Sequence, residues 1–340
     1  MTPVIAVPAA PAAAVVATRG ATTSITERLR ALAIRPQSMT AGELIDRYMA
    51  VYAGRDSSRT QRLAAWHALI GEFTLESLDA DVLHAGRAEL ATEPGLAFKG
   101  LDHAGRKIFK TKAGKPKTPA TLNRYMVAIS AVFTWAIEQR LSPRSWINPC
   151  HGIRRYQEPD GRVRFLDEAE RARFFAACRA SKYPRLFALV LMAMTTGARR
   201  GELLGLRWHD VDLAAGIAYL GKTKNGDRRT LVLLPHMVEA LGPLAGDAPR
   251  YVFGSVRSKY QKPAVIDSAF RDALARSEVS DFRFHDLRHC CASYLAQAGT
   301  PLNVIAEVLG HRKLDMTRRY AHLTTHTKAQ AMRASLGEIK

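Results

Sequence analysis

Five short segments in the second half of the chain carry residue types that phosphoryl transfer requires. Arg199 precedes Glu202 by three residues, a spacing that puts a guanidinium and a carboxylate on one face of a helix. His285 and Arg288 share a face in the same way. Planar guanidinium groups can clamp a phosphodiester whose non-bridging oxygens gain charge, and Tyr320 has an oxygen suited to attack phosphorus. These residue types therefore indicate chemistry on a phosphate ester.

Each of these segments also has a plain structural explanation. An Arg–Glu pair at this spacing is a commonplace exposed ion pair. Lys224 stands just before Asn225-Gly226, and a lysine beside a hairpin turn is usually solvated. His311 directly follows Gly310, a natural helix stop. A tyrosine on a short amphipathic helix is more often a core residue than a nucleophile. The order of the segments therefore carries the functional argument.

The histidines of segment 285–289 do not form a zinc-protease motif. That motif has Glu directly after its first histidine, whereas Asp286 stands there in this chain. Arg288 on the same face would also repel a metal ion. The four cysteines show no spacing typical of a zinc ribbon, a redox pair or a disulfide framework. We expect neither a metal ion nor another cofactor.

Taken in order, the segments resemble the catalytic set of the tyrosine recombinases, the phage integrase family. The resemblance runs through TTGARRGELLGLRW, the KTKNGDRR hairpin, HDLRH and LGHRKLDMTRRYAH, and covers about residues 160–325. The segment TPATLNRYMVAISAVFTWAIEQRLSPRSWINP is more weakly similar to the core-binding domain of that family. The expected active-site residue types are all present in the order of the family.

This resemblance implies a role for each site residue. Tyr320 would attack phosphorus and form a 3′-phosphotyrosine, which conserves the bond energy without ATP. Lys224, with Lys222 as the alternative, would protonate the departing 5′ oxygen, and His285 would act as general acid and base at the tyrosine hydroxyl. The phosphate would be held by Arg199, Arg288 and His311, with Glu202 and His289 as supporting residues.

The charge of the chain points to the same class of partner. Its 50 Lys and Arg residues against 31 Asp and Glu residues give a formal net charge of +19, which favours double-stranded DNA as the partner. The stretch 98–125 holds eight basic residues and one acid, and we expect it to be a phosphate-contacting loop, although a merely solvated loop is the alternative. Its basic residues are Lys99, Arg106, Lys107, Lys110, Lys112, Lys115, Lys117 and Arg124.

The elements that must position these residues are mainly helical. Periodicity predicts helices throughout residues 40–150, the longest over 119–140 with Thr118 as its cap and Pro119 at its first position. In the second half, Asp167 can cap a helix, 183–195 is apolar enough to be central, and 216–220 and 229–234 predict a hairpin. Further helices are predicted over 265–277, 285–298, 301–309, 316–322 and 328–337. The fold class is therefore mainly α (α+β).

The chain is expected to have four parts. The longest apolar run, nine residues from Leu186 to Met194, is far short of the roughly 20 that a membrane span needs. We therefore expect no membrane partner and a cytoplasmic, nucleoid-associated protein. The parts are a flexible low-complexity tail with a short helix (1–37), a helical core-binding, SAM-like domain (38–150), a linker (151–163) and a mixed helical catalytic domain with a small antiparallel sheet and a C-terminal tail (164–340).

The resemblance further implies an assembly and a biological setting. A homotetramer on synapsed DNA would exchange strands through a Holliday junction, for integration or excision of a mobile element. The segment after Tyr320 would dock onto a neighbouring subunit, or else cap its own domain. An accessory DNA-bending or directionality factor is a further candidate partner. Two alternatives are a type IB topoisomerase, which reseals one strand without exchange, and a catalytically silent DNA-binding regulator.

Overall fold

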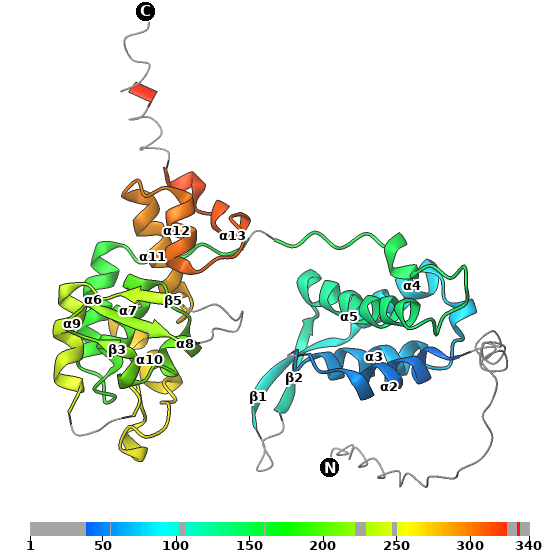
Figure 1. The fold of residues 1–340 in the computed structure, drawn as a ribbon, viewed down its shortest axis with the longest axis horizontal. Coiled ribbons are helices and arrows are strands. Elements are labelled where there is room, and N and C mark those ends of the chain that lie inside the picture. Colours follow the sequence, from blue (N-terminus) through cyan, green and yellow to red (C-terminus); the bar gives the residue numbers. More distant parts are fainter. Residues whose placement is uncertain are drawn as a thin grey trace, which may run out of the picture. The chain divides into compact units, whose positions relative to one another are not determined.

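The computed structural model of the chain divides into two compact units, Met1–Pro159 and Asp160–Lys340, shown in Figure 1. Each unit is described by itself. The structure describes residues 39–54, 56–101, 107–159, 161–221, 229–246, 250–324 and 332–333, with side chains described outside 96–113. The expected N-terminal tail, the short helix within it and the expected helix 328–337 lie outside these residues, apart from 332–333.

The described part of unit 1 contains the α-helices α2 (Ala41–Val51), α3 (Arg59–Ile70), α4 (Ala80–Thr92) and α5 (Pro119–Glu138). Thr118 accepts a hydrogen bond from the backbone N–H of Thr121, which places the start of α5 where the sequence predicted it. The core joins α3 to α5: Trp66 is fully buried and its indole N–H donates to the carbonyl of Tyr125 at 2.9 Å. A polar tip on a buried ring thus fixes the two helices in register.

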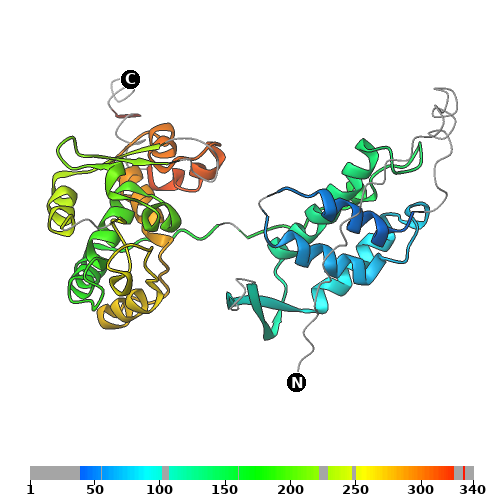
Figure 2. The same cartoon turned by 60° about the horizontal axis from the view of Figure 1, so that its bottom comes forward.

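One element of unit 1 corrects the sequence prediction. Helices were expected throughout 40–150 and a loop over 98–125, but strands β1 (Pro94–Leu101) and β2 (Lys107–Pro116) form an antiparallel hairpin. Figures 1 and 2 both show the hairpin projecting from the helices of unit 1. The glycines and lysines of this stretch are typical of a loop, yet strand-forming residues alternate with the lysines in KIFKTK. Lysines on both strands also discourage pairing with further chains.

Unit 2 surrounds a central apolar helix, α7 (Leu186–Thr196), as the sequence predicted. Strands β3 (Val211–Asp212), β4 (Ile217–Leu220) and β5 (Arg229–Val232) form an antiparallel sheet in the order β3-β4-β5. The two-residue strand β3 was not predicted, because it is too short to show alternation. The remaining helices are α6 (Glu168–Arg179), α8 (Arg200–Leu204), α9 (Pro235–Leu241), α10 (Asp267–Ser277), α11 (Asp286–Gln297), α12 (Leu302–Leu309) and α13 (Asp315–Arg318).

A small second cluster of unit 2 holds its C-terminal helices together. Cys291 on α11, Ile305 and Leu309 on α12, and Tyr320 after α13 are all buried against one another. Figure 1 shows these three helices side by side, in orange to red. All four cysteines of the chain are free thiols. Within the described ranges, no helix is both long enough and apolar enough to cross a membrane.

Candidate active site

The first part of the site is the turn between α7 and α8. Gly197 ends α7 with φ of +60°, a left-handed conformation that glycine adopts without strain. Arg199 then caps α8, its backbone N–H donating to Glu202 Oε2 at 2.8 Å and its Nη1 to Glu202 Oε1 at 2.8 Å. Because one carboxylate binds both the backbone and the guanidinium of Arg199, Glu202 orients that side chain. Glu202, which the sequence predicted to be a supporting residue, thus contacts Arg199 directly.

A second guanidinium reaches the same turn from α11. Arg288 is buried, and its Nη1 donates to the carbonyl of Gly197 at 2.7 Å. Burial first, and then the neighbouring Arg199 and Arg229, lower the pKa of Arg288 to about 10. The group therefore stays cationic at neutral pH. Two arginines that are 89 residues apart in sequence (288 − 199 = 89) thus meet at one glycine turn.

Tyr320 lies against a histidine inside the small C-terminal cluster. Its side chain is only 2% exposed, and its hydroxyl is 2.6 Å from His289 Nδ1. Burial raises the pKa of Tyr320 to about 12, and burial followed by the neighbouring His285 lowers the pKa of His289 to about 4. At neutral pH His289 is therefore uncharged, and its Nδ1 can accept the hydroxyl proton.

This arrangement differs from the one that the resemblance implied. His285 was expected at the tyrosine hydroxyl, but in the structure His289 occupies that place. The His285 ring instead stands perpendicular to that of His289, with the ring centroids 5.4 Å apart. Burial and then Arg288 lower the pKa of His285. Sequence spacing places both histidines on one face of α11, and only tertiary packing decides which of them meets Tyr320.

His311 completes the set of described candidates. It follows Gly310, which ends α12 with φ of +66°, and its Nδ1 lies 2.8 Å from Thr317 Oγ1. Burial, and then the positive charges of Arg288 and Arg199, lower its pKa to about 4. Among the arginines that lower this pKa, the two with the largest effect are those at the α7–α8 turn, so His311 belongs to the same electrostatic site.

Comparison with known proteins identifies the family. Residues 164–327 match the model of the phage integrase family. Residues 164–327 are therefore identified as a domain of the phage integrase family. The integrase of Salmonella phage P22 is 30% identical over 247 residues, covering 66% of this chain and 60% of the relative. A shufflon-specific DNA recombinase of Escherichia coli is 33% identical over 214 residues, covering 62% of this chain and 53% of the relative. The chain thus spans roughly half to three fifths of these relatives.

Solved structures share the fold of this chain. The Tn1549 transposon integrase in complex with transposon right end DNA aligns with a TM-score of 0.63 and 17% identity, over 87% of this chain and 99% of that one. A lambda integrase dimer bound to a COC′ core site aligns with a TM-score of 0.61 and 17% identity, over 88% of this chain and 81% of that one. The expected fold, mainly α with small antiparallel sheets, is confirmed.

Six of the eight predicted DNA-contacting residues lie on strands β1 and β2 or on helix α5 of unit 1. Lys115 and Arg124 are exposed, and Arg124 lines a small pocket beside Arg59 and Arg62. Lys99 lies on β1, and Lys107, Lys110 and Lys112 lie on β2. Lys222 and Lys224, in unit 2, lie outside the described residues, as does Arg106.

Lys117 corrects the prediction. It is 7% exposed, and its Nζ donates to Glu93 Oε2 at 2.6 Å and to the carbonyl of Leu90 at 3.2 Å. The same group lies 5.6 Å from the ring centroid of Tyr125. A lysine whose donors are taken by an acid and a helix-end carbonyl fixes the base of the hairpin and does not face a phosphate. The sequence did not indicate this role, because Lys117 lies within a run of basic residues.

Sequence reasoning missed Arg229 altogether. This arginine begins β5 and lies at the α7–α8 turn, with Nη2 donating to the carbonyl of Thr196 at 2.8 Å. Its Nη1 lies 3.9 Å from Glu202 Oε2. Arg228-Arg229 resembles a solvated end of a hairpin strand, and no periodic signal marks the second arginine as buried. Its position at the start of the second strand of the predicted hairpin was the available signal.

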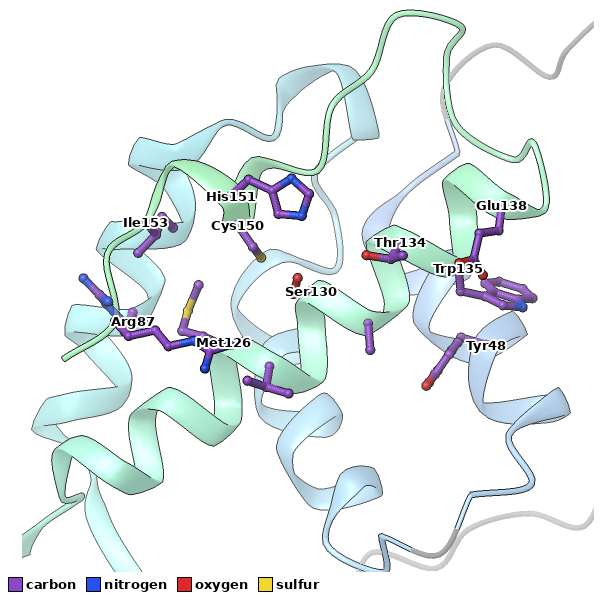
Figure 3. A pocket seen from close by; sticks show the side chains of 13 residues that line it. Tyr48, Arg87, Met126, Ser130, Thr134, Trp135, Glu138, Cys150, His151 and Ile153 are labelled. Carbon is purple, nitrogen blue, oxygen red and sulfur yellow. The ribbon is translucent and has the colours of Figure 1, made fainter. Parts of the chain in front are cut away.

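A pocket of about 700 Å³ lies in unit 1, along one side of α5. Figure 3 shows Tyr48 and Trp135 at one end of it, Arg87 and Met126 at the other, and His151 over the middle. The pocket is lined by unit 1 alone, whereas the candidate catalytic residues that the structure describes all belong to unit 2. Within the described part of the chain, no cluster of three or more His, Cys, Asp or Glu side chains could hold a metal ion.

Proposed function

We propose that the chain is a site-specific DNA recombinase, an integrase that cuts and rejoins DNA through a phosphotyrosine at Tyr320. The observation that carries this proposal is the hydrogen bond of 2.6 Å between the Tyr320 hydroxyl and an uncharged His289, in the unit that also brings Arg199 and Arg288 to one turn. A hydroxyl beside a proton acceptor is a nucleophile, and paired guanidiniums are a phosphate clamp. The integrase and recombinase names of the relatives support the same function.

In the cleavage step, the Tyr320 oxygen bonds to phosphorus as the bond from phosphorus to the 5′ oxygen breaks. The tyrosine proton passes to His289 Nδ1, and the departing 5′ oxygen takes a proton from Lys224. The non-bridging oxygens are held by Arg199, Arg288 and His311. Rejoining is the reverse reaction with a 5′ hydroxyl as the attacking group. Because one phosphodiester is exchanged for another, the step needs no external energy source.

The buried position of Tyr320 adds a condition to this mechanism. A side chain that is 2% exposed cannot touch a phosphate of a DNA duplex. The segment from α13 to the 3-10 turn Ala321–Thr324 must therefore move before attack. This segment buries little besides Tyr320 and Thr317, so its displacement exposes a small apolar area.

Strand exchange requires more than one copy of the chain. We propose a homotetramer that exchanges one pair of strands, passes through a Holliday junction and then exchanges the second pair, so as to integrate or excise a mobile element. A fold relative, lambda integrase, has been solved as a tetramer bound to a Holliday junction, with a TM-score of 0.60 to this chain. Hairpin β1–β2, with Lys115, and the exposed Arg124 at the start of α5 would hold the duplex by its phosphates.

Covalent capture tests the chemistry on DNA of any sequence. A pool of nicked duplexes of randomised sequence lets the cleaved end diffuse away, so that the covalent intermediate accumulates. We expect an SDS-resistant protein–DNA adduct with the wild-type chain and none with Tyr320→Phe. Tyr219→Phe is the matched control, because Tyr219 is 51% exposed on β4. Sequencing the captured DNA would then reveal the target.

Two other outcomes would change the proposal. If neither the wild-type chain nor Tyr320→Phe forms an adduct, while both bind DNA, the protein is a DNA-binding regulator. If the wild-type chain relaxes supercoiled plasmids that carry the captured site but never joins two such sites, it is a topoisomerase.

A further inference from the structure

Arg229 is a cation of unit 2 that the cleavage mechanism does not use, and its side chain is 11% exposed. We propose that Arg229 is a positioning residue for the phosphate clamp: its guanidinium ties the ends of α7 and α12 together and thereby sets Arg199, Arg288 and His311 around one phosphate. This inference rests on the proposed recombinase function and adds a residue to it.

The contacts of Arg229 join segments that are far apart in sequence. Its Nη2 donates to the carbonyl of Thr196, the last residue of α7, at 2.8 Å, and also to the carbonyl of Val308 in the last turn of α12. The final carbonyls of a helix lack intrahelical partners and carry the negative end of its dipole. One guanidinium therefore caps two helix C-termini at once.

Each of these contacts lies next to a clamp residue. Thr196 precedes Gly197, whose carbonyl accepts the hydrogen bond of Arg288. Val308 leads into Gly310 and His311, and a Cβ placed on Gly310 would stand 3.1 Å from Cδ of Arg229. Arg229 thus packs directly against the residue that precedes His311. A shift of its guanidinium would move both turns.

The third connection runs through Glu202, the carboxylate that orients Arg199. Arg229 Nη1 lies 3.9 Å from Glu202 Oε2, too far for a hydrogen bond. Nη1 is buried, and it has no hydrogen-bond partner among the described residues. Burial lowers the pKa of Arg229, Glu202 raises it and Arg199 lowers it again. A partly buried cation whose charge is not fully compensated lowers the stability of the fold. Its positive charge favours the binding of an anion beside Arg199 and Arg288.

The shape of the side chain matters as much as its charge. An arginine presents a planar fork of donors, so it can reach two carbonyls and face a carboxylate together, whereas a lysine offers a single nitrogen. Arg229 also stands five residues after Lys224 in the sequence (229 − 224 = 5), at the start of β5.

The test is single-turnover cleavage of a captured target site by Arg229→Lys and Arg229→Gln. Arg276→Lys is the matched control, because Arg276 also caps a helix: its Nη1 and Nη2 donate to the carbonyls of Ala180 and Ala177 at the end of α6. We expect both Arg229 variants to cleave about 100-fold more slowly, since misplacement of a reacting group by about 1 Å can cost that much. The control should cleave at the wild-type rate.

The amplitude of the reaction separates positioning from folding. If Arg229 has only a structural role, its replacement lowers the fraction of active molecules and therefore the amplitude of cleavage. The molecules that remain folded would then cleave with the wild-type rate constant. We expect the full amplitude, a lower rate constant, an unchanged DNA dissociation constant and an equal slowing of rejoining, because a clamp residue acts on both directions of one transition state.

Three results would count against the inference in different ways. If the wild-type chain forms no adduct, the proposed function fails, and the role of Arg229 fails with it. If the wild-type chain cleaves and the Arg229 variants match its rate constant, only the inference on Arg229 is wrong. If both Arg229 variants lose the native circular dichroism spectrum while Arg276→Lys keeps it, Arg229 serves folding and not the clamp.

Discussion

The two units use buried cations in opposite ways. In unit 1, Lys117 is paired with Glu93 at 2.6 Å, and Arg87 donates to the carbonyl of Arg154 at 2.7 Å while its guanidinium lies 4.1 Å from the ring centroid of Tyr156. These contacts hold elements of unit 1 together, and only Lys117 has a carboxylate partner here, since Arg87 Nε has no hydrogen-bond partner among the described residues. In unit 2, Arg199, Arg229 and Arg288 gather near one carboxylate, Glu202, and Arg199 and Arg229 lower the pKa of Arg288.

This contrast teaches how to separate structural from functional charge. A cation whose charge is neutralised within the fold adds to stability and offers little to a ligand. Guanidiniums that repel one another in a partly buried site are an arrangement that an anion relieves, and such perturbed groups gather at functional sites. The net charge of +19 does not distinguish the two cases, because it counts Lys117 and Arg288 alike.

The largest expected effect comes from removing a clamp arginine. Arg288→Ala should lower the rate constant of single-turnover cleavage by about 100- to 1,000-fold, the range seen when one donor to a transition-state oxyanion is lost. DNA affinity should stay within about an order of magnitude, because other basic residues supply most of the binding. Arg185, also buried in unit 2 but bonded to the carbonyls of Val252 and Leu244, provides a control for stability through Arg185→Ala. If Arg288→Ala lowers DNA affinity by the same factor as the cleavage rate constant, Arg288 contributes to DNA binding as a whole, and the proposed division between clamp and binding surface is wrong.

The next effect distinguishes two histidines of α11. His289→Gln should slow cleavage by about 100-fold or more, the usual contribution of a positioned proton acceptor. His285→Gln should slow it less, because His289 lies 2.6 Å from the tyrosine hydroxyl and His285 contacts the His289 ring. Cleavage rates from pH 5 to pH 9 provide the check. If His285→Gln is the slower of the two, the hydrogen bond in the structure is a resting contact and the proton passes to His285.

Much of this site could be predicted from the order of its residues, and the predictions that were wrong failed for physical reasons. The order of Arg199, Arg288, His311 and Tyr320 indicated the chemistry, because a nucleophile and phosphate-binding residues recurred at the spacing of a known family. The partner of Tyr320 could not be predicted, since His285 and His289 share a helix face and only the packing of the Tyr320 segment selects one of them. The hydrogen-bond partner of Tyr320 is therefore evident only in the three-dimensional structure.

The fold shows the same division between local and long-range signals. Helix α5 began where its cap and proline predicted, because both signals are local. Hairpin β1–β2 was missed, because its pairing of Phe98 with Phe109 depends on a partner strand. Arg229 was missed because its burial depends on Thr196 and Val308, which are 33 and 79 residues away. Long-range contacts such as these are not visible in a single periodic segment.

A moderate effect is expected from acidification, and it should be larger in unit 2. The pKa of His289 and that of His311 are both about 4 in the folded protein, below the ordinary value of 6.5. Between about pH 4 and pH 6.5 the unfolded chain therefore binds more protons than the folded chain. The contribution of these histidines to the free energy of unfolding is fully present above about pH 6.5 and is lost as the pH falls towards 4. Hydrogen exchange at pH 7.5 and pH 5, resolved for α11 and α5, measures the loss in each unit. With His289→Gln and His311→Gln combined, the loss in α11 should shrink; a loss of unchanged size would assign it to other groups.

The smallest effect compares two lysines of one hairpin. Lys115 is exposed and Lys117 is buried against Glu93, so the two test whether location decides function within a single basic run. Lys115→Ala should weaken DNA binding and reduce the slope of log K against log salt by about 1, as expected for one lost phosphate contact, with no change in melting temperature. Lys117→Met should leave the slope unchanged and lower the melting temperature, because Glu93 loses its partner. If both variants reduce the salt slope by about 1, Lys117 also contacts a phosphate of the DNA, and the base of the hairpin belongs to the binding surface.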